Sequence, residues 1–177
     1  MPVPEAVTAE RARVAARFLS GTGIEIGALD APTPLPAAAR ARYVDLRPVK
    51  TLAEHYSELD PKTFVRVDVI DDGERLTRFA DASLDFLVAN HMLEHCENPL
   101  GTMRNHLRKV KPGGILFYAM PDMRIGFDRA RPITPFEHVV ADDRDGGESS
   151  RRAHHLEWAR FANGVTDDAE VARIAEE

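Results

Sequence analysis

The segment Leu84-Asp-Phe-Leu-Val-Ala89 limits the fold of this chain more than any other feature. Five of its six residues are apolar, and turn-forming residues flank it. Such a run is typical of a strand buried on both faces of a parallel sheet. Because parallel strands are joined by crossovers, usually helices, we expect strands and helices to alternate along the chain.

The sequence up to residue 122 follows this alternation. Short runs of apolar and β-branched residues predict further strands at residues 24–27, 43–46, 64–70 and 115–120. Amphipathic patterns predict helices at residues 5–19, 50–59 and 98–111. Pro112-Gly113-Gly114 is expected to end the last of these helices. This order predicts an α/β fold with a doubly wound, mostly parallel sheet.

The sequence beyond Pro121-Asp122 differs in composition from the part before it. It is polar and rich in arginine through Ser150, and the stretch 142–147 is predicted to be a solvated loop. Helical patterns return at 151–162 and 167–176, and no further strand is evident. A chain of 177 residues suits one compact domain. We therefore predict a single domain over residues 1–177, with a core at 20–122 and a substrate-side cover with C-terminal helices at 123–177.

The composition of the chain limits which partners it is expected to bind and where in the cell it is expected to lie. The chain has 23 basic and 29 acidic residues, a formal charge of −6, so we expect no nonspecific binding to nucleic acid or to an anionic membrane. No signal peptide or run of 18 apolar residues is present, which predicts no membrane segment. Cys96 is the single cysteine, so a disulfide framework is excluded and a reducing cytoplasmic location is predicted.

Polar or small residues stand at the end of every predicted strand. In an open parallel sheet, ligands bind beyond the carboxyl ends of the strands. The residues at these ends are Gly27, Asp45, Asp68 or Asp71, Asn90 with His91, and Asp122. Gly27 lets a ligand approach the backbone closely, and Asp45 lies 18 residues downstream, near the spacing of about 20 at which a carboxylate binds ribose hydroxyls. A nucleoside-bearing cofactor is predicted.

The loop after Gly27 bears on which cofactor this is. It lacks a G-x-G-x-x-G motif, and Pro32, Pro34 and Pro36 prevent a helix from starting at once. A pyrophosphate would therefore have no cradle of helix N–H groups. Asp30 would also repel phosphates, whereas it tolerates the sulfonium and ammonium cations of S-adenosylmethionine. S-adenosylmethionine fits better than NAD.

Several motifs together resemble class I S-adenosylmethionine-dependent methyltransferases, over about residues 20–122. The resemblance rests on Gly23-Ile-Glu-Ile-Gly27, Tyr43-Val-Asp45, Ser83-Leu-Asp-Phe-Leu-Val-Ala-Asn-His91-Met-Leu-Glu-His95 and Leu107-Arg-Lys-Val-Lys-Pro-Gly-Gly114. Two further segments, Cys96-Glu-Asn-Pro99 and Pro121-Asp122-Met-Arg124, resemble methyltransferase domains of bacteria that are often found near glycosyltransferases.

The resemblance implies a role for each strand end. It places Glu25 and Gly27 at the methionine end of the cofactor, Asp45 at the ribose, and Asp68 or Asp71 near the adenine. Asn90 and His91 would border the methyl group.

The sequence departs from the family in two places. Family members usually carry two more glycines, where Leu29 and Ala31 stand here. They also usually end in an antiparallel pair of strands, for which this chain shows no signal. Either the last part of the domain is missing, or helices cover the edge of the fifth strand.

Methyl transfer is an in-line displacement, so a base is needed only if the acceptor atom begins protonated. His91 is the first candidate base and His95 the second. Spaced by four residues, they could mimic the two-histidine face of a metal site, but a third ligand is lacking and we predict no metal.

The segment after the fifth strand offers candidate substrate residues. Asp122, Arg124 and His138 are the residues we assign, since arginine pairs well with carboxylate or phosphate. A solvated connector is the alternative interpretation of this segment. The predicted function is methyl transfer to a small molecule or saccharide. A noncatalytic binding module and, less favoured, an NAD-dependent oxidoreductase are the alternatives, and a homo-oligomer is left open.

Overall fold

The computed structural model describes residues 3–174, and these divide into two compact units. The first contains residues 3–94 and 102–120, and the second contains residues 95–101 and 121–174. The predicted domain and the predicted helix at 167–176 include residues 1–2 or 175–177, which lie outside the described residues. Among the described residues, no helix combines the length and the apolar character needed to cross a bilayer.

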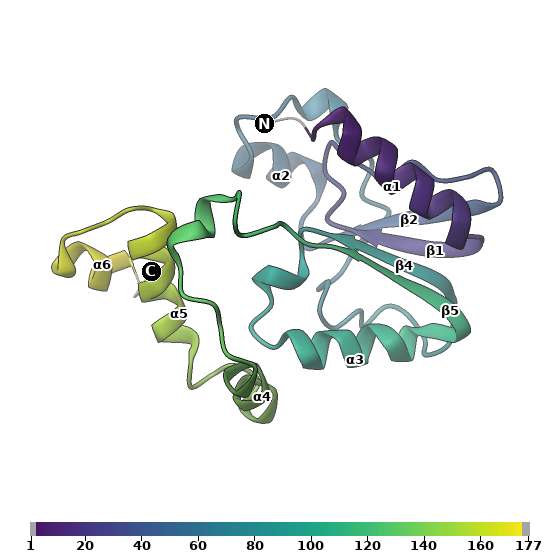
Figure 1. Ribbon diagram of the computed structural model, residues 1–177. Coiled ribbons are helices and arrows are strands. Elements are labelled where there is room, and N and C mark those ends of the chain that lie inside the picture. Colours follow the sequence, from purple (N-terminus) through teal and green to yellow (C-terminus); the bar gives the residue numbers. More distant parts are fainter. Residues whose placement is uncertain (1–2, 175–177) are drawn as a thin grey trace. The chain divides into compact units, whose positions relative to one another are not determined.

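The first unit is built on a five-stranded sheet whose strand pairs are all parallel (Figure 1). The strands are β1 (Gly21–Ile26), β2 (Ala39–Asp45), β3 (Val69–Ile70), β4 (Leu84–Asn90) and β5 (Val110–Ala119). Their order in the sheet is β3-β2-β1-β4-β5. The chain adds β2 and β3 on one side of β1, then crosses back and adds β4 and β5 on the other side, so the strand order reverses between the neighbours β1 and β4. This confirms the predicted doubly wound α/β fold, and it places a ligand crevice at the carboxyl ends of β1 and β4.

Helices lie on both faces of this sheet. Figure 1 shows α1 (Glu5–Phe18) on one side and α3 (Pro99–Lys109) on the other, while α2 (Val49–His55) follows β2. Phe86 and Val88 of β4 join one apolar cluster, and Leu87 and Ala89 join the other. The alternation confirms that β4 is buried on both faces, as its sequence predicts.

Strand β1 begins three residues earlier than expected, because two glycines let it approach β4 closely. A Cβ atom on Gly23 would lie 2.3 Å from the carbonyl oxygen of Phe86, and one on Gly21 would lie 2.4 Å from Asp85 Oδ2. Glycine lacks a Cβ, so both residues fit inside the strand. The two glycines belong to the strand and not to a turn before it.

Other boundaries shift for local reasons. The predicted strand at 64–70 is reduced to β3, because Val65 donates its N–H to the Leu29 carbonyl oxygen (2.8 Å) and leaves the sheet. Pro112-Gly113-Gly114 does not form a turn before β5. It lies inside β5, next to a register shift against β4, with Gly113 at φ +81°. Short 3-10 turns lie at η1 (Pro61–Thr63) and η2 (Leu93–His95).

The second unit contains only helices among its described residues. They are η3 (Phe127–Ala130), α4 (Phe136–Asp145), α5 (Arg151–Glu157), a π-helical continuation η4 (Trp158–Ala162) and α6 (Asp168–Ile174). The predicted loop at 142–147 is therefore wrong for residues 142–145, which complete α4. The helix ends where Gly146 adopts a left-handed conformation at φ 78°, and residues 146–147 lie in a turn. Among residues 3–174, no strand follows Ala119, and β4 is the strand that pairs with β5.

Candidate functional site

A buried network joins the carboxyl ends of β1 and β4. Glu25 of β1 is fully buried, and it accepts hydrogen bonds from the Thr33 amide (3.0 Å), the Thr33 hydroxyl (2.9 Å) and the side-chain amide of Asn90 (3.0 Å). The Asn90 Nδ2 group also donates to the Thr33 hydroxyl oxygen (2.8 Å). These contacts tie the proline-rich loop after β1 to the end of β4.

Arg11 of α1 provides partial charge compensation for this network. Burial raises the pKa of Glu25, and the hydrogen bonds from Thr33 and Asn90 and the charge of Arg11 act against that rise. Burial lowers the pKa of Arg11, and the charge of Glu25 opposes this. The Nε and Nη2 atoms of Arg11 are buried without a hydrogen-bond partner. Both carboxylate oxygens of Glu25 are therefore engaged by the loop, and one of them also by Asn90.

The Oδ1 atom of Asn90 is a buried acceptor with no hydrogen-bond partner. Its orientation follows from its neighbour atoms, since Nδ2 must face the acceptors on Glu25 and Thr33. Buried polar atoms in native proteins are nearly always paired, so each exception calls for an explanation. A ligand that donates a hydrogen bond at the end of β4 provides one.

Gly27 turns the chain out of β1 beside this acceptor. It adopts φ +65°, and its N–H donates to the Val44 carbonyl oxygen (2.9 Å). A Cβ atom at this position would meet nothing within 4 Å, so the space over the turn is open. Leu29, where the family usually has glycine, is also left-handed at φ 47°. Two residues of this turn, Gly27 and Leu29, are therefore left-handed.

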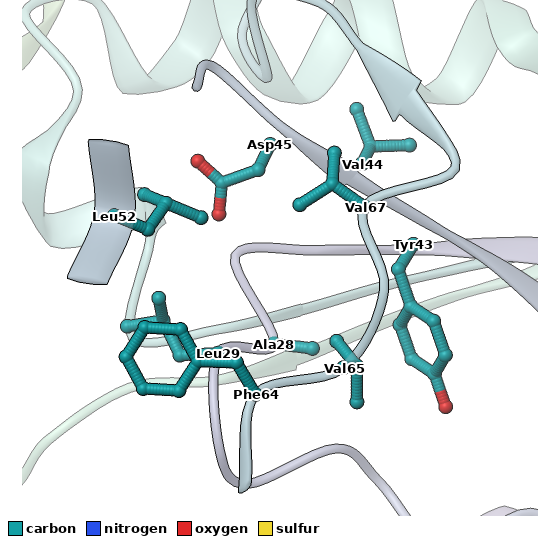
Figure 2. Close-up of a pocket in the computed structure, with 9 residues that line it drawn as sticks. All are labelled: Ala28, Leu29, Tyr43, Val44, Asp45, Leu52, Phe64, Val65 and Val67. Carbon is teal, nitrogen blue, oxygen red and sulfur yellow. The ribbon is translucent and has the colours of Figure 1, made fainter. Parts of the chain in front are cut away.

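Asp45, at the end of β2, lines a small hollow. The hollow has a volume of about 10 Å³, and Figure 2 shows Asp45 among side chains that are otherwise mostly apolar: Ala28, Leu29, Tyr43, Val44, Leu52, Phe64, Val65 and Val67. Burial raises the pKa of Asp45, and the backbone N–H groups of Arg47 and Leu46 oppose the rise. A hollow of this size admits about one water molecule, far less than the roughly 300–1,000 Å³ of most ligand pockets, so a ribose would reach this half-buried carboxylate only if the walls moved apart.

The two aspartates proposed for the adenine end occupy different places. Asp71 follows β3 at the same edge as Asp45, but its carboxylate already accepts the Arg78 N–H (2.8 Å) and the Thr77 hydroxyl (2.9 Å). Asp68 precedes β3, where it accepts the Tyr43 N–H (3.0 Å) and pairs with Arg66. Because the carboxyl end of β3 comes after Ile70, the structure places Asp71 and not Asp68 at the crevice edge.

The candidate bases are exposed. His91 follows Asn90 in a left-handed conformation (φ 52°), donates its backbone N–H to Ala119 O, and holds its Nδ1 atom 3.4 Å from a Glu94 carboxylate oxygen. His95 ends η2 in the second unit and is exposed. Neither histidine belongs to the one group of three potential metal ligands found among the described residues.

The residues assigned to the substrate all lie in the second unit. Asp122 accepts the Arg124 Nε–H (2.9 Å), so this exposed arginine is held by its neighbour, and the contact lowers the pKa of Asp122. His138 has its Nε2 atom 2.7 Å from that of His154. The structure therefore shows an ion pair at 122–124 and a separate histidine pair.

Three site-supporting residues escape sequence reasoning. Thr33 stands in an aperiodic loop and Arg11 on the first helix, so nothing in the sequence connects them to Glu25. His106 is fully buried, with Nε2 2.7 Å from Gly73 O and Nδ1 2.9 Å from the Tyr118 hydroxyl. Burial lowers the pKa of His106. The sequence signal for its burial was its position four residues after Thr102, on the same face of the helix.

The strand order defines a Rossmann-like α/β fold with polar residues at the carboxyl ends of its strands. Residues 16–118, more than half of the chain, match the family described as methyltransferase domain, and the chain belongs to this family. Membership of this family indicates S-adenosylmethionine as the cofactor. No curated protein matches the chain in sequence.

Several solved structures are similar in fold. A SAM-dependent methyltransferase from Aquifex aeolicus is 13% identical, with a TM-score of 0.48 over 96% of this chain and 77% of that one. A Bacillus halodurans protein is 16% identical (TM-score 0.49, 84% of this chain and 60% of that one). A Haloferax volcanii chain solved with the Trm112 methyltransferase activator is 22% identical (TM-score 0.44, 64% and 51%). This chain thus spans 60% of the Bacillus protein and 51% of the Haloferax chain, and at these identities no substrate or partner follows.

The residues present fit S-adenosylmethionine. The unpaired Asn90 Oδ1 is a buried acceptor suited to an ammonium group, and the open turn at Gly27 leaves room for a chain to pass over it. No helix begins between β1 and β2, so a pyrophosphate finds no helix N-terminus there.

Proposed function

We propose that this protein transfers a methyl group from S-adenosylmethionine to a small-molecule or saccharide acceptor. The observation that carries the proposal is the unpaired acceptor on Asn90, which stands at the crevice end of β4 beside the open turn at Gly27. When bound, the cofactor supplies a methyl group on a sulfonium, which an acceptor atom can displace in line.

Each strand-end residue then has a binding role. Asn90 accepts from the ammonium group, the Gly27 turn lines the methionine end under the support of Glu25, and Asp45 accepts from the ribose hydroxyls. Asp71 is the better placed of the two aspartates proposed for the adenine end, with Asp68 as the alternative.

His91 is the residue we propose as base. Its Nδ1 atom faces Glu94, and that contact orients the ring so that Nε2 is the atom left to receive a proton from the acceptor. His95 is the second candidate. Asn is the replacement to test, because it tolerates the left-handed backbone of His91 better than most residues. We expect His91→Asn to lower turnover by about 100- to 10,000-fold and to remove a pH-dependent step, if the acceptor begins protonated.

The acceptor class rests on weaker support. The exposed Arg124 and Asp122 pair offers charged groups for a polar acceptor, and the motifs at 96–99 and 121–124 resemble domains found near glycosyltransferases. These features support a saccharide or a small anionic molecule. The single cysteine supports a cytoplasmic location as part of the same proposal.

Calorimetry with S-adenosylhomocysteine tests the cofactor site. We expect Asp45→Ala to weaken binding by roughly 1–3 kcal/mol, about 5- to 150-fold, through lost charged hydrogen bonds. Asp81→Ala is the matched control, because Asp81 precedes β4 at the opposite edge of the sheet and pairs with Lys109. Equal affinities in the wild type and in Asp45→Ala would remove Asp45 from the site.

A noncatalytic methyltransferase-fold module is the alternative that one observation favours, namely the small size of the hollow at Asp45. Transfer of a labelled methyl group to any acceptor in a panel of saccharides and small acids separates the two. Labelled product excludes the module, whereas tight S-adenosylhomocysteine binding with no product across the panel supports it.

A further inference from the structure

Three potential metal ligands converge in the second unit, in a cluster formed by His138, Asp142 and His154. One ligand atom from each lies within 4.8 Å of the others. The Nε2 atoms of His138 and His154 are 2.7 Å apart, and Asp142 Oδ2 is 3.4 Å from His138 Nε2. The two imidazole rings are stacked, with centroids 4.9 Å apart and planes inclined by 18°.

The local fold brings these residues together from two helices. His138 and Asp142 are four residues apart on α4, so they share one helix face. Gly146 ends α4, and the Gly147 N–H donates to Asp142 O (2.8 Å), which folds the chain back toward α5. Gly147 is also required for space, because a Cβ there would lie 2.5 Å from the Glu97 carbonyl oxygen.

The carboxylate of the cluster is buried and already oriented. Asp142 is 3% exposed, and the Ser150 hydroxyl donates to its Oδ1 atom over 2.6 Å. This bond leaves Oδ2 to face His138. Such a hydroxyl-to-carboxylate bond is the kind of outer contact that orients metal ligands in known sites.

A single proton cannot satisfy the three convergent atoms. One imidazole N–H can bridge the two Nε2 atoms, but it leaves Asp142 Oδ2 without a donor in the cluster. A buried carboxylate oxygen in that state is costly. A cation accepts electron pairs from all three atoms at once.

We propose that His138, Asp142 and His154 bind a divalent transition-metal ion of the Zn²⁺ class. An ion about 2.1 Å from each nitrogen would see the two nitrogens, 2.7 Å apart, at an angle of about 80°, so the tetrahedral geometry usual for zinc requires the two rings to move apart on binding. Imidazole ligands favour zinc, iron, cobalt or nickel over magnesium or calcium. Three protein ligands leave at least one position for water or another small ligand.

This inference does not depend on methyl transfer, and it departs from our expectation from the sequence that the protein holds no metal. The sequence drew attention to His91 and His95, whereas the cluster joins residues 16 positions apart. The role of His138 in binding the methyl acceptor stays a prediction, separate from its proposed role as a metal ligand.

The test is equilibrium dialysis of the metal-free full chain against Zn²⁺, with bound metal measured by elemental analysis. We expect one equivalent of Zn²⁺ in the wild type and no tight binding of Mg²⁺. His138→Ala and His154→Ala should each weaken Zn²⁺ binding at least tenfold, and Ser150→Ala should weaken it about tenfold through Asp142. The matched control is His155→Ala, an exposed histidine next to His154 on α5, which should bind like the wild type.

Co²⁺ provides a second measurement that does not depend on the stability of a variant. The wild-type protein with one equivalent of Co²⁺ should show visible absorption bands of a bound ion, and Zn²⁺ should displace them. Failure of the wild type to bind either ion overturns the proposal and leaves a histidine–histidine hydrogen bond. Equal loss of binding in His155→Ala also overturns it, because the bound metal would then lie elsewhere.

Discussion

Glu25 in the first unit and Asp142 in the second are both buried carboxylates, and they differ in how many of their oxygens accept hydrogen bonds. Both oxygens of Glu25 accept hydrogen bonds, from the Thr33 amide and hydroxyl and from Asn90. Asp142 has one oxygen bound by Ser150, and its other oxygen faces His138. A saturated carboxylate fixes the backbone around it, whereas a half-satisfied one is available as a ligand. Burial alone does not distinguish the two roles.

The largest expected effect is on the saturated carboxylate. Glu25→Ala leaves the Thr33 N–H and its hydroxyl without an acceptor, and it should lower the free energy of unfolding by roughly 1–3 kcal/mol. Urea unfolding followed by circular dichroism measures this. Glu10→Ala is the control, since Glu10 is exposed and pairs with Arg13, and it should leave the free energy of unfolding close to that of the wild type. Equal effects would contradict the structural role of Glu25.

The next effect is a pH dependence. Because burial raises the pKa of Glu25 above 4.5, the folded protein holds more protons than the unfolded chain between 4.5 and the folded pKa. The stability contributed by this group is full below 4.5 and decreases as the pH rises through that window. Glu25→Gln should remove this decrease in urea unfolding measured at a series of pH values. If the free energy of unfolding falls with pH equally in the variant and the wild type, the pKa of Glu25 does not differ between the folded and unfolded states.

His106 should give the opposite sign. Burial lowers its pKa below 6.5, so the folded state prefers the neutral ring. Its stability contribution is present above 6.5 and is lost as the pH falls through the folded pKa. His106→Gln should cost about 1 kcal/mol at a pH of about 7.5 and should flatten the acid side of the stability profile. If the variant loses stability at acid pH as the wild type does, another group causes that loss.

The smallest effect should come from the half-satisfied carboxylate. In metal-free protein, Asp142→Asn should change the free energy of unfolding by less than about 0.5 kcal/mol, because its amide oxygen still accepts from Ser150 and its N–H can reach His138. Urea unfolding in the presence of a chelator measures this. A loss as large as that of Glu25→Ala would erase the distinction between the two carboxylates.

The sheet of the first unit could be predicted because its apolar runs are short, bounded and alternately buried. Strand β4 is the clearest example, and the preference of ligands for strand ends singled out Gly27, Asp45 and Asn90 in the sequence. The early start of β1 could not be predicted, since it depends on how closely Gly23 approaches Phe86. The shortening of β3 likewise depends on a hydrogen bond made by Val65 outside the sheet.

The candidate site residues that the sequence singled out within the sheet are those that end a strand. The partners of Glu25 stand on a loop and on a distant helix, and no periodicity links them to it. The helix α4 was missed because its polar residues resemble a loop until Asp142 is seen to be buried. The histidine cluster needed the turn at Gly146 and Gly147, which brings α5 back to α4.

Leu29 lines the hollow at Asp45, and its backbone is conformationally strained. A leucine held in the left-handed region costs about 1–2 kcal/mol relative to an ordinary conformation. If this turn rearranges to admit an adenosine, the released strain offsets part of the work of pushing the side chains apart. Glycine at this position would leave more space in the hollow but would store no such strain, so we expect ligand entry and relaxation of this turn to be coupled in this chain.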